Sequence, residues 1–312
     1  MIIFDVVLIV FSALILWIGA LWVVDSASIL ARKFRLSDMT IGLTIVALGT
    51  SLPEFLVTAT AAFKDMGDIA LSNIVGSNIF NLGIILGLLA LIKPIPAQRT
   101  LVHRDGPILF LLGLFVLIML YDLNMGRGAG LILVIFFVSY NLLVFLRGAR
   151  IPQELVPAEA KSAQKKDYLK LAGGFILLAL GGQFMVEGAS SLAARAGISE
   201  WAIGVSIVAA GTSLPELITC LAALFRDKKE MLLGNLIGSD IFNFAGVLGL
   251  TCILAPISFS QAALPGMFTF LFMVAIVIFF MRTGFRITRL EGAVLICISL
   301  FRWGLDYSIL PL

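Results

Sequence analysis

Two short motifs each occur twice in the chain, and one of them places a carboxylate directly after a proline in an apolar run. Gly49 to Glu54 reads Gly-Thr-Ser-Leu-Pro-Glu, and the same six residues recur from Gly211 to Glu216. A second motif, Gly76 to Asn81, recurs with one change from Gly238 to Asn243, and both repeat at one offset (211 − 49 = 162 and 238 − 76 = 162). Carboxylates inside apolar segments mark ion sites in membrane proteins. The motifs therefore predict a cation site within a duplicated unit.

Each proline predicts a helix break that supplies oxygen ligands. Proline lacks an amide hydrogen and clashes with the carbonyl group four residues earlier. Pro53 should therefore free carbonyl oxygens near Thr50, and Pro215 should free those near Thr212. Backbone without its helical hydrogen bonds is tolerated at membrane depth only where it lines a cavity or is buried in protein. The break itself therefore points to a site.

The side chains around each break complete a set of oxygen atoms. Glu54 and Glu216 add negative charge, and neighbouring hydroxyl groups add neutral oxygens, namely those of Thr50, Ser51, Thr212 and Ser213. The second motif spaces Ser and Asn four apart on one helix face, at Ser77 with Asn81 and at Ser239 with Asn243. Ca²⁺ accepts ~6–8 oxygen ligands, whereas soft metals need the Cys or His that both motifs lack. A purely structural interpretation stays open, since small polar residues often only hydrogen-bond a neighbouring membrane helix.

The two glutamates also predict how a carrier would work. Glu54 and Glu216 carry two negative charges when ionised, and leaving them without a cation in hydrocarbon would cost several kcal/mol. An empty site should therefore not reorient across the membrane. We expect the protein to change sides only when it holds Ca²⁺, or enough Na⁺ or H⁺ to replace that charge.

The composition indicates the elements that must position these residues. Of 312 residues 60% are hydrophobic and 13% charged, and the mean hydropathy of +1.09 excludes a water-soluble protein. Runs near the ~20 residues that cross a bilayer recur along the chain. We predict an all-α polytopic membrane protein with ten transmembrane helices, at residues 4–31, 40–64, 68–92, 104–121, 128–147, 168–194, 201–224, 230–254, 262–281 and 288–308.

Basic residues indicate the orientation of these spans. With the N-terminus outside, 18 of the 22 Lys and Arg residues fall in inner loops, where the positive-inside rule expects them. The net charge of +3 thus reflects topology and gives no support to a nucleic-acid partner. Five spans lie on each side of a polar stretch. Because this number is odd, the second repeat has the opposite orientation in the membrane. We predict two inverted five-helix repeats, 1–146 and 168–312, joined by a cytoplasmic linker at 147–167.

The paired motifs resemble the two repeats of the cation/Ca²⁺ antiporter superfamily, in its prokaryotic sodium/calcium exchanger branch. The resemblance extends over essentially the whole chain. It implies ten transmembrane helices, of which the long first and sixth slide against a bundle of the other eight. It implies a secondary antiporter in the cell inner (plasma) membrane that exchanges Ca²⁺ for Na⁺ by alternating access. No cofactor is expected beside the transported ions, and the oligomeric state is not predicted.

The resemblance also implies a set of cation ligands. The side chains are those of Glu54, Glu216, Ser51, Ser213, Ser77, Asn81, Ser239 and Asn243. The backbone carbonyls of Thr50 and Thr212 join them, and those of Ala47 and Ala209 are implied as outlying Na⁺ ligands.

One position departs from the family pattern. Some members carry aspartate where Asn243 stands, whereas this chain has its aspartate one helical turn earlier, at Asp240. The equivalent residue of the first repeat is the neutral Asn78. Asp240 is equally consistent with a ligand or proton-titrating group and with a structural acid that is hydrogen-bonded within the bundle. The exchange of residues leaves the choice between Na⁺ and H⁺ open.

Two alternative functions remain. A Ca²⁺/H⁺ exchanger would use protons, but that branch usually replaces the Pro-Glu pattern that this chain keeps at Pro53 and Pro215. A cation channel with a carboxylate-lined pore belongs to another class and more often builds a ring from parallel repeats or subunits. An enzyme is not expected, because the sequence contains no nucleophile–base pair and no phosphate-binding loop.

Overall fold

The computed structural model describes residues 2–147, 163–197, 209–261 and 264–309. Its contacts divide the chain into two units. Unit 1 comprises Met1–Glu54 with Ser139–Gly238, and unit 2 comprises Phe55–Val138 with Ser239–Leu312. Each unit therefore combines parts of both sequence repeats.

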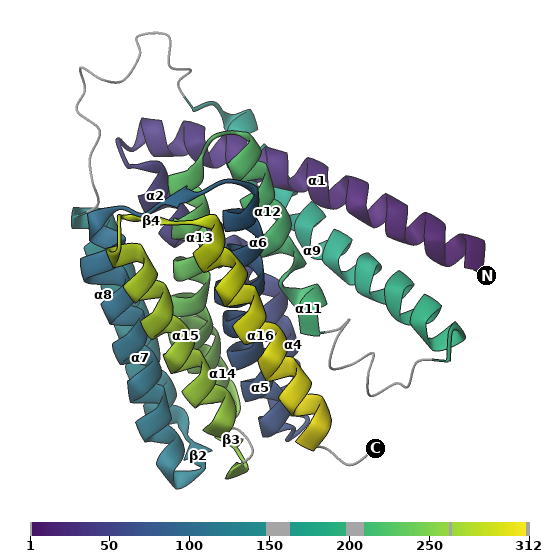
Figure 1. Cartoon of the computed structure of the whole chain (residues 1–312), viewed down its shortest axis with the longest axis vertical. Helices are drawn as coiled ribbons and strands as arrows, with labels where there is room; N and C mark the ends of the chain where they lie inside the picture. The colour runs from purple at the N-terminus through teal and green to yellow at the C-terminus, as the bar shows by residue number, and fades with distance from the viewer. Residues whose placement is uncertain (1, 148–162, 198–208, 262–263, 310–312) are drawn as a thin grey trace. The chain divides into compact units, whose positions relative to one another are not determined.

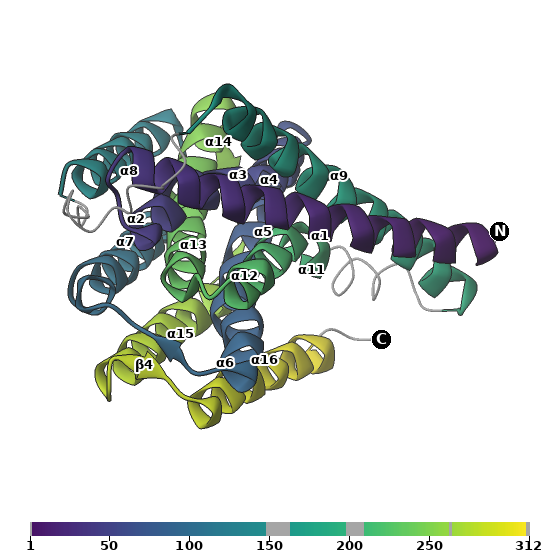
Figure 2. The same cartoon turned by 90° about the horizontal axis from the view of Figure 1, so that it is seen from above.

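Two long helices dominate unit 1. Helix α1 (Ile2–Lys33) has 32 residues and α9 (Lys165–Arg195) has 31, and the two run side by side along their length (Figures 1 and 2). A helix of this length measures about 47 Å, which exceeds the ~30 Å hydrocarbon core and requires tilt in a membrane. Glycine allows the close approach, since a Cβ atom on Gly19 would lie 2.9 Å from the Gly174 carbonyl oxygen.

Polar contacts tie this helix pair at both ends. The Arg195 Nε atom donates to the buried Asp5 carboxylate at 2.9 Å. At the opposite end, the Lys33 ammonium donates to the Tyr168 hydroxyl at 2.8 Å. The ends of α1 and α9 are thereby fixed to each other, and the pair is built to behave as one element of unit 1.

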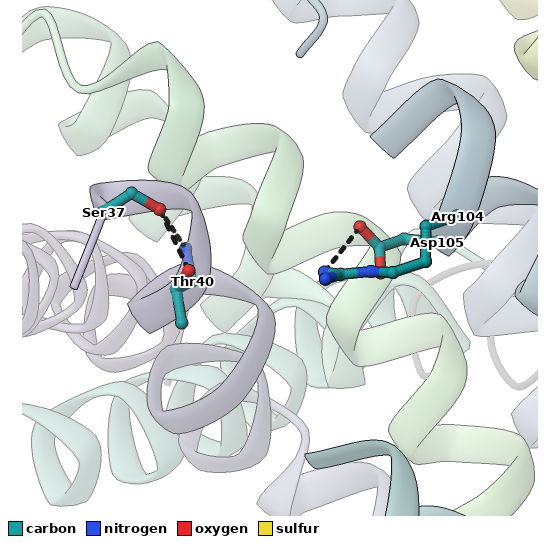
Figure 3. Close-up of polar contacts among 4 residues, drawn as sticks. All are labelled: Ser37, Thr40, Arg104 and Asp105. Carbon is teal, nitrogen blue, oxygen red and sulfur yellow. Dashed lines mark hydrogen bonds and ion pairs between the residues drawn. The ribbon is translucent and has the colours of Figure 1, made fainter. Parts of the chain in front are cut away.

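The remaining helices of unit 1 are short or interrupted. They are α2 (Asp38–Ile41), the π-helix η1 (Gly42–Val46), α3 (Ala47–Thr50), α11 (Ala209–Thr212) and α12 (Leu214–Phe225). Helices α4 (Leu52–Phe63), α8 (Arg127–Arg147) and α13 (Lys229–Ile241) contribute residues to both units. Helix α2 begins at a capped end, where the Ser37 hydroxyl accepts a hydrogen bond from the Thr40 amide at 3.1 Å (Figure 3).

Unit 2 is a bundle of helices with two very short strand pairs. Its first part holds α5 (Gly67–Phe80), η2 (Asn81–Ile85), α6 (Leu86–Ile92), η3 (Leu101–Asp105), α7 (Gly106–Met119) and η4 (Leu120–Asp122). Its second part holds η7 (Phe242–Val247), α14 (Leu248–Leu254), α15 (Leu264–Arg282) and α16 (Arg289–Ile309). Helix α16 packs on α6, and α15 packs on α7 (Figure 2).

The strand pairs of unit 2 join the ends of these helices. Strand β1 (Ile95–Pro96) pairs antiparallel with β4 (Arg286–Ile287), and β2 (Asn124–Met125) pairs with β3 (Ile257–Ser258). Ile95 faces Ile287 in one pair, and Met125 faces Ile257 in the other. Each strand lies 162 residues from a strand of the other pair, so the two pairings are reciprocal.

A buried acid near the start of α7 is neutralised locally. Asp105 is fully buried at the end of η3, and it accepts two hydrogen bonds from the guanidinium group of its neighbour Arg104, at 2.8 and 3.2 Å (Figure 3). This paired geometry offsets the cost of burying the carboxylate.

Turn geometry recurs at the offset of the sequence motifs. Positive φ angles occur at Arg35 and Gly197, at Asp65 and Asp227, and at Leu123 and Phe285, and the members of each pair are 162 residues apart. Because few residues other than glycine adopt positive φ, three matched pairs are a specific sign that both halves fold alike.

The described helices agree with most of the predicted spans. Seven are long and apolar enough to cross a membrane, and the pair Asp38–Thr50 and Leu52–Phe63, bent by 45°, is an eighth candidate. The count of ten is not reached among the described residues, since the predicted span 201–224 begins outside them and α16 is not among these candidates. Of the predicted linker 147–167, residues 148–162 lie outside the described part of the chain, and Lys165–Asp167 already belong to α9. A capping box explains that earlier start, since the Asp167 carboxylate accepts from the Gln164 amide at 2.8 Å.

Close helix packing in unit 1 gives a test of stability. A methyl group at Gly234 of α13 would lie 2.5 Å from the Met39 carbonyl oxygen. Gly234→Ala should therefore lower the free energy of unfolding by about 1–3 kcal/mol, because backbone cannot yield as a side chain can. The melting temperature of the purified protein in detergent measures this effect.

Gly76→Ala is the matched control for that substitution. It also lies within a helix, but an added Cβ atom there meets nothing within 4 Å. Its melting temperature should equal or exceed that of the unchanged protein, since alanine is the better helix former. Equal melting temperatures for the two variants would contradict the packing argument.

Candidate cation-binding site

Both copies of the proline motif interrupt their helices at a serine. Helix α3 ends at Thr50 and α4 begins at Leu52, and in the second copy α11 ends at Thr212 and α12 begins at Leu214. The intervening Ser51 and Ser213 have nearly identical backbone angles, with φ of −87° and −88°. Each proline is then the second residue of the following helix, where its missing amide hydrogen costs nothing. The interruption expected from proline is present, and it falls two residues before the proline.

The two breaks exchange hydrogen bonds within unit 1. The Ser51 hydroxyl donates to the Glu216 carboxylate at 2.8 Å, and the Ser213 hydroxyl donates to the Glu54 carboxylate at 3.2 Å. All four side chains are fully buried. Each serine thus bonds to the glutamate of the opposite copy, and the pairs are related by the 162-residue offset.

These contacts bring the two predicted carboxylates into one buried cluster. Like charges repel each other in a low dielectric, and a hydroxyl donor compensates a buried carboxylate only partly. A cation beside both groups would offset the repulsion and supply the missing solvation. The electrostatics of the cluster therefore favour a bound cation.

Further polar atoms surround the first break. The Thr50 hydroxyl lies 3.2 Å from the Asn235 side-chain oxygen and 3.3 Å from the Ala47 carbonyl oxygen. Asn235 in turn donates to the Cys220 sulfur at 3.4 Å. Of the second copy, Thr212 is buried and Ala209 is the first residue of α11.

The second motif forms another buried cluster, in unit 2. The Asn81 side-chain amide donates to the Asp240 carboxylate at 3.0 Å, and that of Asn243 donates to the Asn78 side-chain oxygen at 2.8 Å. These pairs are reciprocal at the same 162-residue offset. Ser77 and Ser239 are buried as well, with exposed fractions of 2% and 0%.

Local helix geometry widens at both asparagines. The π-helix η2 begins at Asn81, and η7 begins one residue before Asn243. Single π-turns in α-helices concentrate at functional sites, because they displace side chains from the regular helical stack. The side-chain oxygens of Asn81 and Asn243 are buried and have no hydrogen-bond partner among the described residues. Unit 2 thus holds two buried neutral oxygens that are available to another partner.

The predicted site residues therefore fall into two groups. The cluster of unit 1 contains Glu54, Glu216, Ser51, Ser213, Thr50 and Ala47. The cluster of unit 2 contains Asn81, Asn243 and Asp240. Among the described residues no three Asp, Glu, His or Cys side chains form a metal-binding group.

Sequence reasoning assigned no function to two residues that the structure includes in these clusters. Asn235 connects Thr50 to Cys220, a cysteine that sequence analysis alone would treat as an apolar packing residue. Asn78 accepts the hydrogen bond of Asn243. Asn235 lies 162 residues after Asn73, so the repeat register already relates these two asparagines in the sequence. The Asn73 amide makes the equivalent contact in the first repeat, where it donates to the Thr58 hydroxyl oxygen at 3.0 Å.

A family model described as sodium/calcium exchanger protein matches residues 4–146 and 167–301. The chain belongs to the sodium/calcium exchanger family. The resemblance inferred from the paired motifs is thereby confirmed, and membership of this family makes the chain a transport protein and not an enzyme. Its apolar helices and this family together make it a mostly helical, multi-pass membrane protein.

Similar proteins extend over nearly the whole chain. The putative antiporter CaxA of Alkalimonas amylolytica is 36% identical and covers 91% of this chain and 92% of its own length. The sodium/calcium exchanger MaX1 of Methanosarcina acetivorans is 29% identical and covers 89% of this chain and 91% of its own length. A structure of the sodium-calcium exchanger NCX_Mj matches with a TM-score of 0.86 at 30% identity and covers 97% of this chain and 99% of that one.

The reciprocal serine–glutamate contacts give a second test of stability. Ser51→Ala removes the hydroxyl group that donates to Glu216 at 2.8 Å, and it should cost about 1–3 kcal/mol, as expected for a hydrogen bond to a buried charged group. Ser213→Ala should cost less, because its bond to Glu54 is longer, at 3.2 Å. Unfolding of the purified variants without divalent ions measures both effects. Ser72→Ala is the control, since that exposed hydroxyl bonds only within its own helix, and an equal loss there would contradict the assignment.

Proposed function

We propose that the chain is a secondary antiporter that exchanges Ca²⁺ for Na⁺ across the membrane by alternating access. The single observation that carries the proposal is the reciprocal pairing of Ser51 with Glu216 and of Ser213 with Glu54. It gathers two carboxylates at two helix breaks, where a cation is needed to balance them. Family membership and the similarity to NCX_Mj support the same function.

The proposed ligands are the oxygens expected from the paired motifs. Glu54 and Glu216 supply the charge, and the neutral ligands are Ser51, Ser213, Ser77, Ser239, Asn81 and Asn243. The carbonyl oxygens of Thr50 and Thr212 serve Ca²⁺, and those of Ala47 and Ala209 serve outlying Na⁺ ions. Two charges and several neutral oxygens suit Ca²⁺, which tolerates an irregular shell better than Mg²⁺ does.

The proposed architecture is ten transmembrane helices in two inverted five-helix repeats, 1–146 and 168–312. Reciprocal contacts at one offset support it, both in the strand pairs of unit 2 and in the serine–glutamate pairs of unit 1. An axis in the membrane plane that exchanges the two halves would produce such reciprocity.

The orientation follows from charge. The distribution of Lys and Arg supports an N-terminus outside and a cytoplasmic linker near 147–167. Insertion in the cell's inner membrane is proposed from the family alone. In this arrangement the turn at Asp65 faces outside and the equivalent turn at Asp227 faces the cytoplasm.

Ion flux in sealed vesicles tests the proposed function. Purified protein is reconstituted, the vesicles are loaded with Ca²⁺, and Na⁺ or H⁺ gradients are imposed separately. An inward Na⁺ gradient should drive Ca²⁺ out against its own gradient. Efflux driven only by protons would indicate Ca²⁺/H⁺ exchange, and Ca²⁺ movement without a counter-ion would indicate a channel.

Glutamine variants connect that flux to the site. Glu54→Gln and Glu216→Gln should each reduce exchange about 100-fold or more, because losing one charged partner in a buried site costs ~3–5 kcal/mol. Glu187→Gln is the control, since this acid is exposed on α9. Normal exchange by both site variants would remove the glutamates from the mechanism.

Accessibility of the two equivalent turns tests the inverted repeat. Asp65 and Asp227 are exposed, lie 162 residues apart and share positive φ angles of 56° and 58°. In a background with the exposed Cys297 replaced by Ser, Asp65→Cys should react with an impermeant maleimide from outside, and Asp227→Cys only after the membrane is opened. Labelling of both variants from the same side would rule out the inversion.

A further inference from the structure

Four side chains of the second motif form one ordered hydrogen-bond network in unit 2. Asn78, Asn81, Asp240 and Asn243 are all fully buried. Asn81 donates to the Asp240 carboxylate, and Asn243 donates to the Asn78 side-chain oxygen. In addition, the Asn78 amide lies 3.3 Å from the Asp240 backbone carbonyl oxygen and donates to it. Asp240 therefore contributes two acceptors to one network.

The chemistry of these groups fixes which way each amide is turned. The Asn81 amide donates to a carboxylate oxygen of Asp240, so its NH₂ group faces Asp240. A backbone carbonyl only accepts hydrogen bonds, so Asn78 must present its NH₂ group to residue 240 and its oxygen to Asn243. The NH₂ group of Asn243 is then fixed as well. Residue 240 thus determines the orientation of Asn81, the first residue of η2. Through Asn78 it also determines the orientation of Asn243, the second residue of η7.

The consequence appears at the opposite ends of the two amides. With their NH₂ groups held, Asn81 and Asn243 keep their side-chain oxygens for another partner, and neither oxygen has a hydrogen bond within the described residues. An amide free to rotate would present NH₂ to a cation in part of its population. Holding the amide removes that unfavourable arrangement before the ion arrives.

We propose that Asp240 is a positioning residue, which orients the Asn81 side-chain oxygen toward the transported cation through the hydrogen bond to its amide. This inference rests on the proposed function, in which Asn81 is a ligand. Asp240 itself does not need to touch the ion, since its carboxylate is engaged by Asn81 at 3.0 Å. The repeat-equivalent Asn78 does the same for Asn243 with a neutral oxygen at 2.8 Å.

The two halves differ in the group that holds their asparagine. The acceptor for Asn81 is a carboxylate oxygen of Asp240 at 3.0 Å, and the acceptor for Asn243 is the amide oxygen of Asn78 at 2.8 Å. This difference arises from the one substitution that separates the two copies of the motif. Because the Asn78–Asn243 pair works with an amide, an amide at position 240 should preserve the geometry.

Equilibrium Ca²⁺ binding to the purified full-length protein tests the proposal. Asp240→Ala removes the acceptor and should weaken Ca²⁺ binding by about tenfold to 100-fold. Asp240→Asn keeps an acceptor and should stay within about threefold of the unchanged protein, as the Asn78 contact suggests. A loss with Asn as large as that with Ala would overturn the proposal.

A double-mutant cycle separates positioning from direct ligation. If Asp240 acts through Asn81, then Asp240→Ala should change Ca²⁺ affinity by less than about twofold in a protein that already has Asn81→Ala. If Asp240 is itself a ligand or acts by its charge, the loss in that background should be as large as in the unchanged protein, and the proposal fails.

Glu54→Gln separates the two hypotheses. If it abolishes binding while the Asp240 variants have no effect, only the positioning proposal fails. If Glu54→Gln also binds normally, the proposed function fails.

Discussion

A carboxylate buried in a membrane protein must find a partner other than bulk water, and in this chain each of two carboxylates finds the hydroxyl group of the opposite helix break. Ser51 donates to Glu216, and Ser213 donates to Glu54. The arrangement requires that both helices stop at a serine, because a continuous α-helix would bond its own backbone and carry the hydroxyls past the acids. The break, the proline that follows it and the placement of the two acids are therefore one structural requirement.

Reciprocity is the common feature of the contacts that hold the molecule. The same 162-residue relation connects the serine–glutamate pairs, the asparagine pairs, the two strand pairs and the turns with positive φ. It also appears in close packing, where a Cβ atom on Gly87 would approach the Gly292 carbonyl oxygen and one on Gly249 would approach that of Gly130. Each of these contacts therefore has an equivalent in the other half of the sequence. The proposed alternating access could use such a repeat, because two similar halves can exchange conformations.

The sequence predicted the parts of this structure that depend on residue type and periodicity. The helix bounds near 2–33, 67–92 and 229–254 and the interruptions before Pro53 and Pro215 follow from apolar length and proline chemistry. The crossed partners could not be predicted, since nothing in Gly-Thr-Ser-Leu-Pro-Glu tells whether Ser51 bonds to Glu54 or to Glu216. Nor does a helical pattern anticipate the π-turns at η2 and η7, which depend on tertiary packing and not on local preference.

The hydrogen-bond partners of Asp240 could not be predicted from the spacing of the motif. By spacing alone it shares a helix face with the motif and resembles a third ligand. In the structure its carboxylate accepts from Asn81 and its backbone oxygen accepts from Asn78, so its position in the network explains its burial without an ion. If Asp240 is the positioning residue proposed for it, then the charge of the site comes from Glu54 and Glu216, and the orientation of a neutral ligand comes from a different acid in the second motif. The charge and the geometry of the site would then depend on different residues.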